Sequence, residues 1–377
     1  MQALMQSINA KHSFKQLILN RLLIVSLILI CVTSMHAEKP VVARSPQPVA
    51  ARSATAAPAG APSPGTFRRY SPTTETALPA SYPYIAPQKM RFSGNGLQID
   101  LFAKHFSQGE PVYIEVIRLP GREAAAEAPV VSFEGKPIRM NQFSWGWRGM
   151  FALAPTVAAP AWKKISATYG GKTEDYKLFV QKTNFPVFRT VMTIPALSNQ
   201  SEITKPDNTA FIQRCHEKKQ LVFARISQDT LSNRVAFPRD MYRVTSPFNA
   251  KRIYERFQVQ GKKKVALPSQ FHFHNGLDMY ARWGDPIFAM ADGVAVIAEN
   301  MFYEGGFTAL DHGNGIFTLY MHQTKLLIKE GQLVRAGDLI GQAGATGAAN
   351  GSHLHVSLFV GGVPLDPMGL LSLPIRN

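Results

Sequence analysis

The side chains best suited to chemistry are histidines gathered toward the C-terminal end of the chain. The sequence contains ten histidines, and six of them fall in residues 272–355. Three short patterns stand out there: His274 with Asp278 four residues later, Tyr320-Met321-His322, and His353-Leu354-His355. Imidazole and carboxylate groups gathered in this way indicate either a metal site or a site of proton transfer.

The His353-Leu354-His355 pattern predicts two histidines on one face of a β-strand, because side chains two residues apart in a strand project to the same side. One of them can bind a metal while the other lies within reach of the metal's water. His274 and Asp278, in an irregular or extended segment, add a nitrogen and an oxygen ligand, and Gly276 allows a tight backbone between them. Two histidines and one carboxylate are typical of a catalytic zinc site, although iron is bound by the same set.

Further segments with their own glycine and aspartate patterns surround these histidines. They are Ser246-Pro247-Phe248, His274-Asn275-Gly276-Leu277-Asp278, Gly284–Ala295, Asp311–Gly315, Tyr320-Met321-His322, Val334–Gly341, Gly344–Gly347 and His353-Leu354-His355. Together they closely resemble the lysostaphin/LytM-type zinc metallopeptidases over the C-terminal part of the chain. The resemblance implies an endopeptidase with Zn²⁺ as cofactor, and as substrate the peptide cross-links or stem peptides of bacterial peptidoglycan.

The resemblance also implies a role for each histidine of the three patterns. It makes His274, Asp278 and His355 the zinc ligands. His322 and His353 match the two histidines that do not bind the metal. We expect His353 to accept a proton from the water or to orient it, and His322 to stabilise the tetrahedral intermediate, although the resemblance does not fix which does which.

Members of the family that have lost metal ligands serve only as activators of other hydrolases. All five positions are present here, which favours an active enzyme. Two alternatives stay open: a catalytically silent wall-binding or amidase-activating protein, and a zinc peptidase that acts on proteins rather than on the wall.

Other residues near these patterns are expected to have lesser roles. His272 is predicted to be a groove or surface residue, and no role is assigned to His312. Met321 is larger than the residue usual at its place in the family and is expected to narrow the groove beside His322. Lys262-Lys263-Lys264 is interpreted as a solvated loop tip.

The elements that must position the site are predicted to be strands. Helix signals are almost absent from residues 239–371, so we expect a mainly antiparallel β domain with a groove lined by sheet residues. Three turns are predicted, at Asp292-Gly293 between Ile287–Ala291 and Val294–Ala298, between Phe307–Asp311 and Gly315–Tyr320, and at Gly361-Gly362 after His353–Val360.

Upstream of this domain, alternating short strands over residues 90–185 predict a β-sandwich of immunoglobulin-like size. Residues 186–238 are predicted to be a linker with a helix, which begins near Pro206 and ends before Ser227. The fold class is thus mainly β, with an N-terminal sandwich followed by the metallopeptidase domain.

The first part of the chain is predicted to serve export. Residues 1–37 combine three cationic residues with an apolar run from Leu22 to Val32, as in a secretory signal peptide, and residues 38–89 form a Pro/Ala-rich tether. An uncleaved signal that anchors the protein in the membrane is the alternative. Either way we expect an exported protein of the periplasm or cell envelope.

The charge balance fits this location. The chain has 377 residues, of which 45% are hydrophobic, and 41 Lys+Arg against 25 Asp+Glu give a net charge of +16. This composition excludes disorder throughout, collagen and coiled coil. Removal of Lys11, Lys15 and Arg21 with the signal leaves 38 − 25 = +13. Because no helix-turn-helix, RNP or finger spacing accompanies the lysines, the anionic partner is predicted to be cell wall and not nucleic acid.

Overall fold

The computed structural model describes residues 86–120, 127–194, 206–240, 243–260 and 263–376. The predicted signal peptide and all but the end of the predicted tether lie outside these residues. Among the described residues, none of the helices combines the length and the apolar character needed to cross a membrane.

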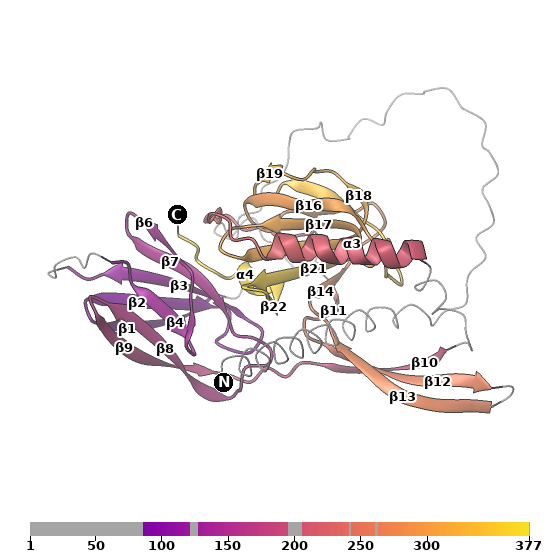
Figure 1. The fold of residues 1–377 in the computed structure, drawn as a ribbon, viewed down its shortest axis with the longest axis horizontal. Helices are drawn as coiled ribbons and strands as arrows, with labels where there is room; N and C mark the ends of the chain where they lie inside the picture. Colours follow the sequence, from indigo (N-terminus) through magenta and orange to yellow (C-terminus); the bar gives the residue numbers. More distant parts are fainter. Residues whose placement is uncertain (1–85, 121–126, 195–205, 241–242, 261–262, 377) are drawn as a thin grey trace, which may run out of the picture.

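Residues 88–180 form two antiparallel sheets that face each other (Figure 1). The five-stranded sheet has the order β1 (Gln88–Gly94), β2 (Leu97–Ala103), β3 (Pro111–Arg118), β7 (Gly146–Ala152) and β6 (Met140–Phe143). The four-stranded sheet has the order β5 (Lys136–Pro137), β4 (Val130–Phe133), β8 (Ala161–Tyr169) and β9 (Lys172–Val180). β1 begins before Met90, where the sandwich was predicted to start.

The core of this sandwich is built from alternate residues of the two sheets. Ile99 and Leu101 of β2 are fully buried, as are Ile165 of β8 and Leu178 of β9, and all four belong to one apolar cluster. Because side chains alternate across a strand, their neighbours face outward. The predicted β-sandwich is confirmed.

The C-terminal part is a ten-stranded sheet whose strand pairs are all antiparallel. Its main path runs through β11 (Val244–Ser246), β14 (Leu277–Tyr280), β21 (His353–Val360), β18 (Ile316–Leu326), β17 (Gly305–Asp311), β16 (Gly293–Met301) and β19 (Leu333–Val334). Three strands lie off this path: β15 (Pro286–Phe288), β20 (Leu339–Ala343) and β22 (Val363–Leu365). The predicted mainly antiparallel β domain is confirmed.

Two of the three predicted turns in this sheet are present, and one is wrong. β17 pairs with β18, and β21 pairs with β22, as the sequence indicated. β15 instead pairs with β20, and β16 pairs with β17 and β19, so Asp292-Gly293 does not close a hairpin. Asp292 has another task, since its carboxylate accepts hydrogen bonds from the Ala336 amide (2.8 Å) and the Arg234 guanidinium (2.6 Å).

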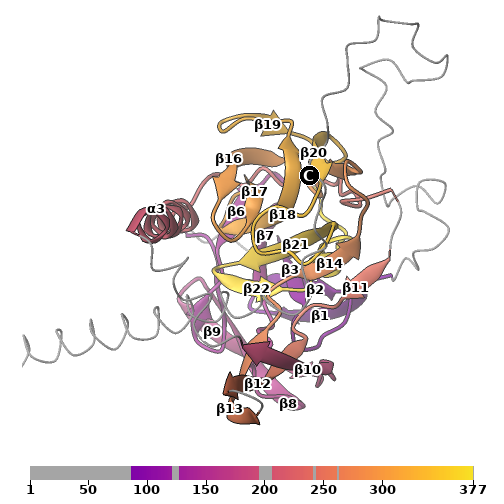
Figure 2. The ribbon, with the colours of Figure 1, turned by 90° about the vertical axis from the view of Figure 1, so that its right-hand side faces the viewer.

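The predicted helix is α3 (Pro206–Phe223), and it covers one end of a face of the large sheet (Figure 2). Its buried Cys215 and Val222 pack against Phe317 and Leu319 of β18. Phe317 is paired with Phe359 of β21, and Leu319 with Ser357, so their side chains share one sheet face. His355 and His353 continue that alternation along β21 and project from the same face, beyond the end that α3 covers.

A separate three-stranded sheet extends away from the large sheet (Figure 1). It consists of β10 (Val187–Ile194), which runs parallel to β12 (Lys251–Gln260), and β13 (Lys263–Phe273), which runs antiparallel to β12. β10 falls within the segment that was predicted as linker. Its Val, Thr and Ile content is typical of a strand, and this signal in the sequence was missed.

The two β regions contact each other through both polar and apolar side chains. Arg148 of β7 forms an ion pair with Asp229 (Nε to Oδ2, 3.0 Å) and donates to the Leu231 carbonyl (2.6 Å). Lys104 lies 3.1 Å from Glu110 and 2.8 Å from Asp366, which precedes α4 (Pro367–Leu370). The sandwich is therefore docked on the C-terminal part by the ion pairs Arg148–Asp229 and Lys104–Asp366, together with apolar packing of Tyr113 and Met150.

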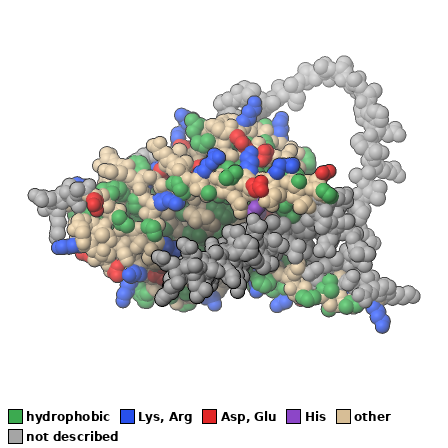
Figure 3. Space-filling model, in the orientation of Figure 1, with side chains coloured by type: hydrophobic (Ala, Val, Ile, Leu, Met, Phe, Trp, Pro, Cys, Tyr) green, Lys and Arg blue, Asp and Glu red, His purple; other side chains and the backbone are tan. Residues whose placement is uncertain are grey.

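The described surface shows no single cationic patch on the face drawn in Figure 3, where Lys and Arg side chains are dispersed among acidic and apolar ones. The positive balance therefore acts on this face as a diffuse attraction.

Candidate metal centre

Two neighbouring strands bring three of the predicted residues together. In the pairing of β14 with β21, Asp278 lies opposite His355, and His274 lies just before β14. A Cβ placed on Gly276 would lie 2.5 Å from His355 Nε2 and 2.4 Å from Ser357 Oγ. Gly276 is thus required for the close approach of the segment to β21.

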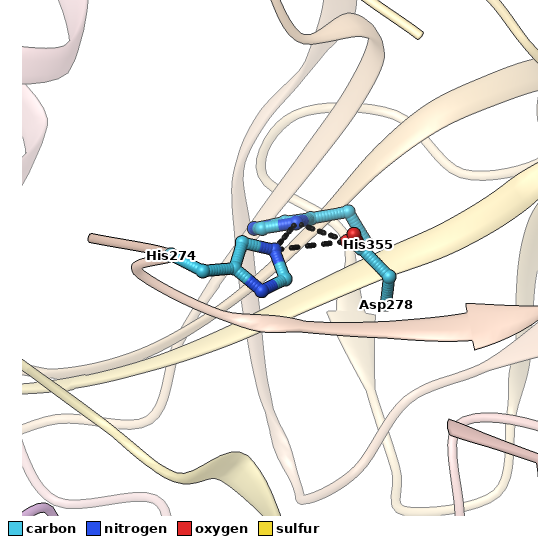
Figure 4. A group of neighbouring side chains, drawn as sticks. All are labelled: His274, Asp278 and His355. Carbon is cyan, nitrogen blue, oxygen red and sulfur yellow. Dashed lines mark hydrogen bonds and ion pairs between the residues drawn. The ribbon is translucent and has the colours of Figure 1, made fainter. Parts of the chain in front are cut away.

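One atom from each of the three side chains points to a common place (Figure 4). His274 Nε2 lies 3.0 Å from Asp278 Oδ1 and 3.1 Å from His355 Nδ1, and His355 Nδ1 lies 2.8 Å from Asp278 Oδ1. These residues are the one group of three or more His, Cys, Asp or Glu side chains in the described chain whose atoms are placed to hold a metal ion.

The second polar atom of each side chain is held by a different partner. His274 Nδ1 lies 3.0 Å from the Pro247 carbonyl oxygen, and His355 Nε2 lies 2.9 Å from the Ser357 hydroxyl. Asp278 Oδ2 accepts a hydrogen bond of 2.9 Å from Arg252 of β12. Such outer contacts fix the orientation of side chains that bind metals and leave the inner atoms free for the ion.

The electrostatics of the cluster favour an ionised Asp278 and a neutral His355. Burial alone would raise the pKa of Asp278, but the hydrogen bonds from His274 and His355 outweigh it and hold that pKa far below its usual range. Burial lowers the pKa of His355. A carboxylate and unprotonated imidazoles are the forms in which these groups bind metals.

The other two predicted histidines stand beside this cluster. His353 Nδ1 lies 2.8 Å from the Gly351 carbonyl oxygen, and its Nε2 lies 3.7 Å from Asp278 Oδ1. The ring of His322 lies 4.7 Å from that of His353 and 6.1 Å from that of His355. All five residues predicted for the site are therefore brought to one place.

His322 is held in an unusual backbone conformation. Its φ is +63°, in the left-handed region that residues with a Cβ seldom adopt, and its amide donates to the Glu304 carbonyl (2.8 Å). Its Nδ1 lies 2.9 Å from the Thr346 carbonyl oxygen. Burial lowers the pKa of His322 to about 3, so the ring is neutral at physiological pH. Strain of this kind gathers at functional sites.

The residues given lesser roles lie outside the cluster. His272 stacks on Tyr254 across the three-stranded sheet, with ring centroids 5.3 Å apart. His312 is fully buried and contacts the Asp292 carbonyl oxygen and the Thr318 hydroxyl, at 2.8 and 2.7 Å. Met321 is paired with His355 across β18 and β21. Lys262, the first of the three lysines predicted to form a loop tip, falls outside the described residues.

Two residues that hold side chains of the cluster were not predicted from the sequence. They are Arg252 and Ser357, and both contact side chains of the cluster. Ser357 follows His353 and His355 at the same two-residue spacing along β21. Its place on the same face of the strand could therefore have been predicted from the sequence. Arg252 is distant in sequence, and the register of β12 was needed to find it.

Comparison with known proteins finds a family match over the segment that contains the cluster. The family model described as "Peptidase family M23" matches residues 272–367. Peptidoglycan DD-endopeptidase ShyA of Vibrio cholerae is 36% identical over 128 residues, which cover 31% of this chain and 30% of that protein. Peptidoglycan DD-endopeptidase ShyB of the same organism is 35% identical over 145 residues, which cover 38% and 31%. The chain thus spans about three tenths of the length of these curated relatives.

Among solved structures, the catalytic domain of lysostaphin from Staphylococcus simulans is 32% identical, with a TM-score of 0.26, and the match covers 27% of this chain and 80% of that domain.

Proposed function

We propose that this chain, whose residues 272–367 form a peptidase M23 domain, is a zinc metalloendopeptidase that hydrolyses peptide bonds in the cross-links or stem peptides of bacterial peptidoglycan. The observation that carries the proposal is the convergence of His274 Nε2, Asp278 Oδ1 and His355 Nδ1 within 4.8 Å of one another. The curated relatives ShyA and ShyB, named as peptidoglycan DD-endopeptidases, support the substrate class.

The donor set fits zinc. Two imidazole nitrogens and one carboxylate oxygen are ligands that zinc accepts, and three protein ligands leave a position for water or substrate, as in catalytic sites. When bound, the ion supplies a water of lowered pKa and polarises the carbonyl of the scissile bond. His274, Asp278 and His355 are the residues proposed to hold it.

The two remaining histidines are proposed to handle protons and charge. His353 keeps its Nδ1 at the Gly351 carbonyl, which directs Nε2 toward the cluster, where it is placed to accept a proton from the attacking water. His322 keeps its Nδ1 at the Thr346 carbonyl, so Nε2 is the atom placed to stabilise negative charge on the tetrahedral intermediate. The backbone of His322 has a positive φ and is held by the hydrogen bond from its amide to the Glu304 carbonyl.

We place the protein in the cell envelope, where peptidoglycan is found. The predicted signal peptide of residues 1–37 would deliver it there, either free in the periplasm or tethered to the membrane through an uncleaved signal. The net charge of +13 on the remaining chain would raise the rate of encounter with the anionic wall.

Mass spectrometry of purified sacculi after incubation with the zinc-loaded protein tests the proposal. We expect soluble muropeptides with a new free amine in the cross-link or stem, and their absence after the metal is chelated. Binding to sacculi without product would identify a catalytically silent wall-binding protein instead. Cleavage of a protein substrate but not of sacculi would identify a protein-directed peptidase.

A further inference from the structure

Tyr280 extends the face of the metal cluster toward solvent. It lies opposite His353 in the pairing of β14 with β21, just as Asp278 lies opposite His355. Alternate residues of a strand share a face, so Tyr280 projects from the same side of the sheet as Asp278. Tyr280 is 42% exposed, whereas the cluster is nearly buried. A substrate lying over the cluster and His353 would therefore meet Tyr280.

Two arginines accompany this tyrosine. The guanidinium of Arg243 lies over the Tyr280 ring, with Cζ 5.8 Å from the centroid, and the Tyr280 amide donates to the Arg243 carbonyl at 2.8 Å. Arg282 follows Tyr280 by two residues, just beyond the end of β14. Both arginines are exposed. They come from different segments, so this cationic rim depends on the pairing of β11 with β14.

The carboxylates near this rim already have other partners. Asp285 is paired with Arg239 (2.9 Å) and also accepts the Arg282 amide (2.7 Å). Asp278 Oδ2 is bound by Arg252. Within the part of the chain that the structure describes, neither Arg243 nor Arg282 forms a salt bridge with a carboxylate. Arginine presents a planar fork of donors that matches a carboxylate, and such charge-assisted bonds are about twice as strong as neutral ones.

We propose that Arg243, Tyr280 and Arg282 form a subsite for a free carboxylate of the peptide substrate. This inference rests on the proposed peptidase function and adds to it a preference for an acidic peptide. The guanidinium groups would bind the carboxylate, and the Tyr280 ring would support the adjoining backbone.

The spacing of the strand locates that carboxylate relative to the bond that is cut. Asp278 and Tyr280 are two residues apart, or about 7 Å at about 3.3 Å per strand residue. An extended peptide advances by the same amount, so the recognised carboxylate belongs about two residues from the scissile carbonyl, on the side of His353.

Equilibrium binding tests the subsite without depending on turnover. The ligands are two uncross-linked synthetic stem peptides that differ in one group, a free carboxylate in the first and a carboxamide in the second. Their dissociation constants are measured by calorimetry on the zinc-loaded full chain, and mass spectrometry checks that each peptide stays intact. We expect the carboxylate peptide to bind about tenfold more tightly, as for one charge-assisted contact.

Substitution of the rim then assigns the preference to these residues. Arg243→Gln with Arg282→Gln should reduce the tenfold preference to near unity, and each single variant should reduce it in part. Arg335→Gln is the matched control, because this exposed arginine follows β19 at the opposite end of the sheet path, and it should keep the full preference. Circular dichroism checks that the variants fold.

The outcomes separate this inference from the proposed function. A wild-type protein without preference, or a double variant that keeps it, would overturn the subsite even if sacculi are hydrolysed. A preference that depends on both arginines, in a protein that releases no product from sacculi, would support the subsite while the proposed hydrolysis fails.

Discussion

The sandwich and the large sheet bury polar side chains in different places. The apolar cluster between the two sheets of the sandwich contains no charged residue. Its buried Arg148 and Glu110 instead lie where the sandwich meets the C-terminal part. The large sheet buries His274, His355 and His322 on one of its own faces.

This difference distinguishes buried polar residues that stabilise the fold from those proposed to bind the metal and take part in the reaction. A buried polar group is costly unless it is hydrogen-bonded, so each one needs a reason to be retained. For Arg148 the reason is docking, since its partners Asp229 and Leu231 belong to the other region. Asp100 and Glu115 of the sandwich are instead paired within the sandwich, with Arg91 and Tyr113. In the large sheet the polar atoms face one another around an open position, as a metal site requires. The substitutions below test this separation.

Removal of a proposed metal ligand should have the largest effect. His355→Ala deletes one of the three converging atoms, and we expect the metal content to fall from about one ion per chain to near zero, with activity on sacculi reduced by at least about a hundredfold. Elemental analysis of the purified protein measures the metal. His272→Ala is the matched control, because this histidine lies outside the cluster and its loss should leave the metal in place. A His355→Ala protein with full metal content would refute the ligand assignment.

His322→Ala should separate metal binding from catalysis. The ring faces the cluster without contributing to its converging atoms, so the variant should keep its metal and lose about 10²- to 10⁴-fold in turnover, the range typical of a positioned proton donor or acceptor. Metal analysis and the rate of muropeptide release are measured on the same preparation. Equal turnover in variant and wild type would show that His322 belongs to the fold and not to the reaction.

Arg148→Met tests the polar docking of the sandwich. The side chains of Arg148 and Asp229 are only 4% and 7% exposed, so the change leaves a buried carboxylate without its cation and should cost about 3–5 kcal/mol in the free energy of unfolding. Urea denaturation measures the loss. The double variant Arg148→Met with Asp229→Leu should recover much of it, because no buried charge is then unpaired. If the single variant is as stable as wild type, docking does not depend on this pair.

Arg252→Gln should weaken the site in a smaller way. Arg252 holds the outer oxygen of Asp278 and supplies no converging atom of its own, and loss of such a partner lowers metal affinity by about 10- to 100-fold. Competition with a chromophoric chelator measures the affinity. Arg335→Gln serves again as the control with the same change of charge. An unchanged affinity would mean that the geometry of Asp278 is set by the backbone alone.

The sequence identified site residues where residue types suited to metal binding or proton transfer also follow the two-residue period of a strand. His353 and His355 follow the two-residue period of a strand, and Asp278 lies opposite His355, so the candidate residues could be found before their strand partners were known. Pairings between distant segments were not accessible in this way. The partnership of β15 with β20 and the parallel pairing of β10 with β12 depend on register, which local sequence does not encode. Arg252 and Arg148 gain their importance only through such distant contacts.

The smallest predicted effect concerns pH and the docking surface. Burial, aided by the nearby Asp366 carboxylate and opposed by Lys104, raises the pKa of Glu110 to about 8. The folded protein therefore holds a proton that the unfolded chain has released above its ordinary pKa of 4.5. This contribution to stability is fully present below pH 4.5 and is lost as the pH rises through about 8.

We expect Glu110→Gln to remove this loss, so that the variant exceeds wild type by about 1–3 kcal/mol in the free energy of unfolding above pH 8 and matches it near pH 4.5. Urea denaturation across this range measures the difference, with Glu127→Gln as an exposed control. Parallel stability profiles for Glu110→Gln and wild type would mean that Glu110 is ionised in the folded protein, and that the sandwich is docked by a fully charged cluster with Lys104 and Asp366.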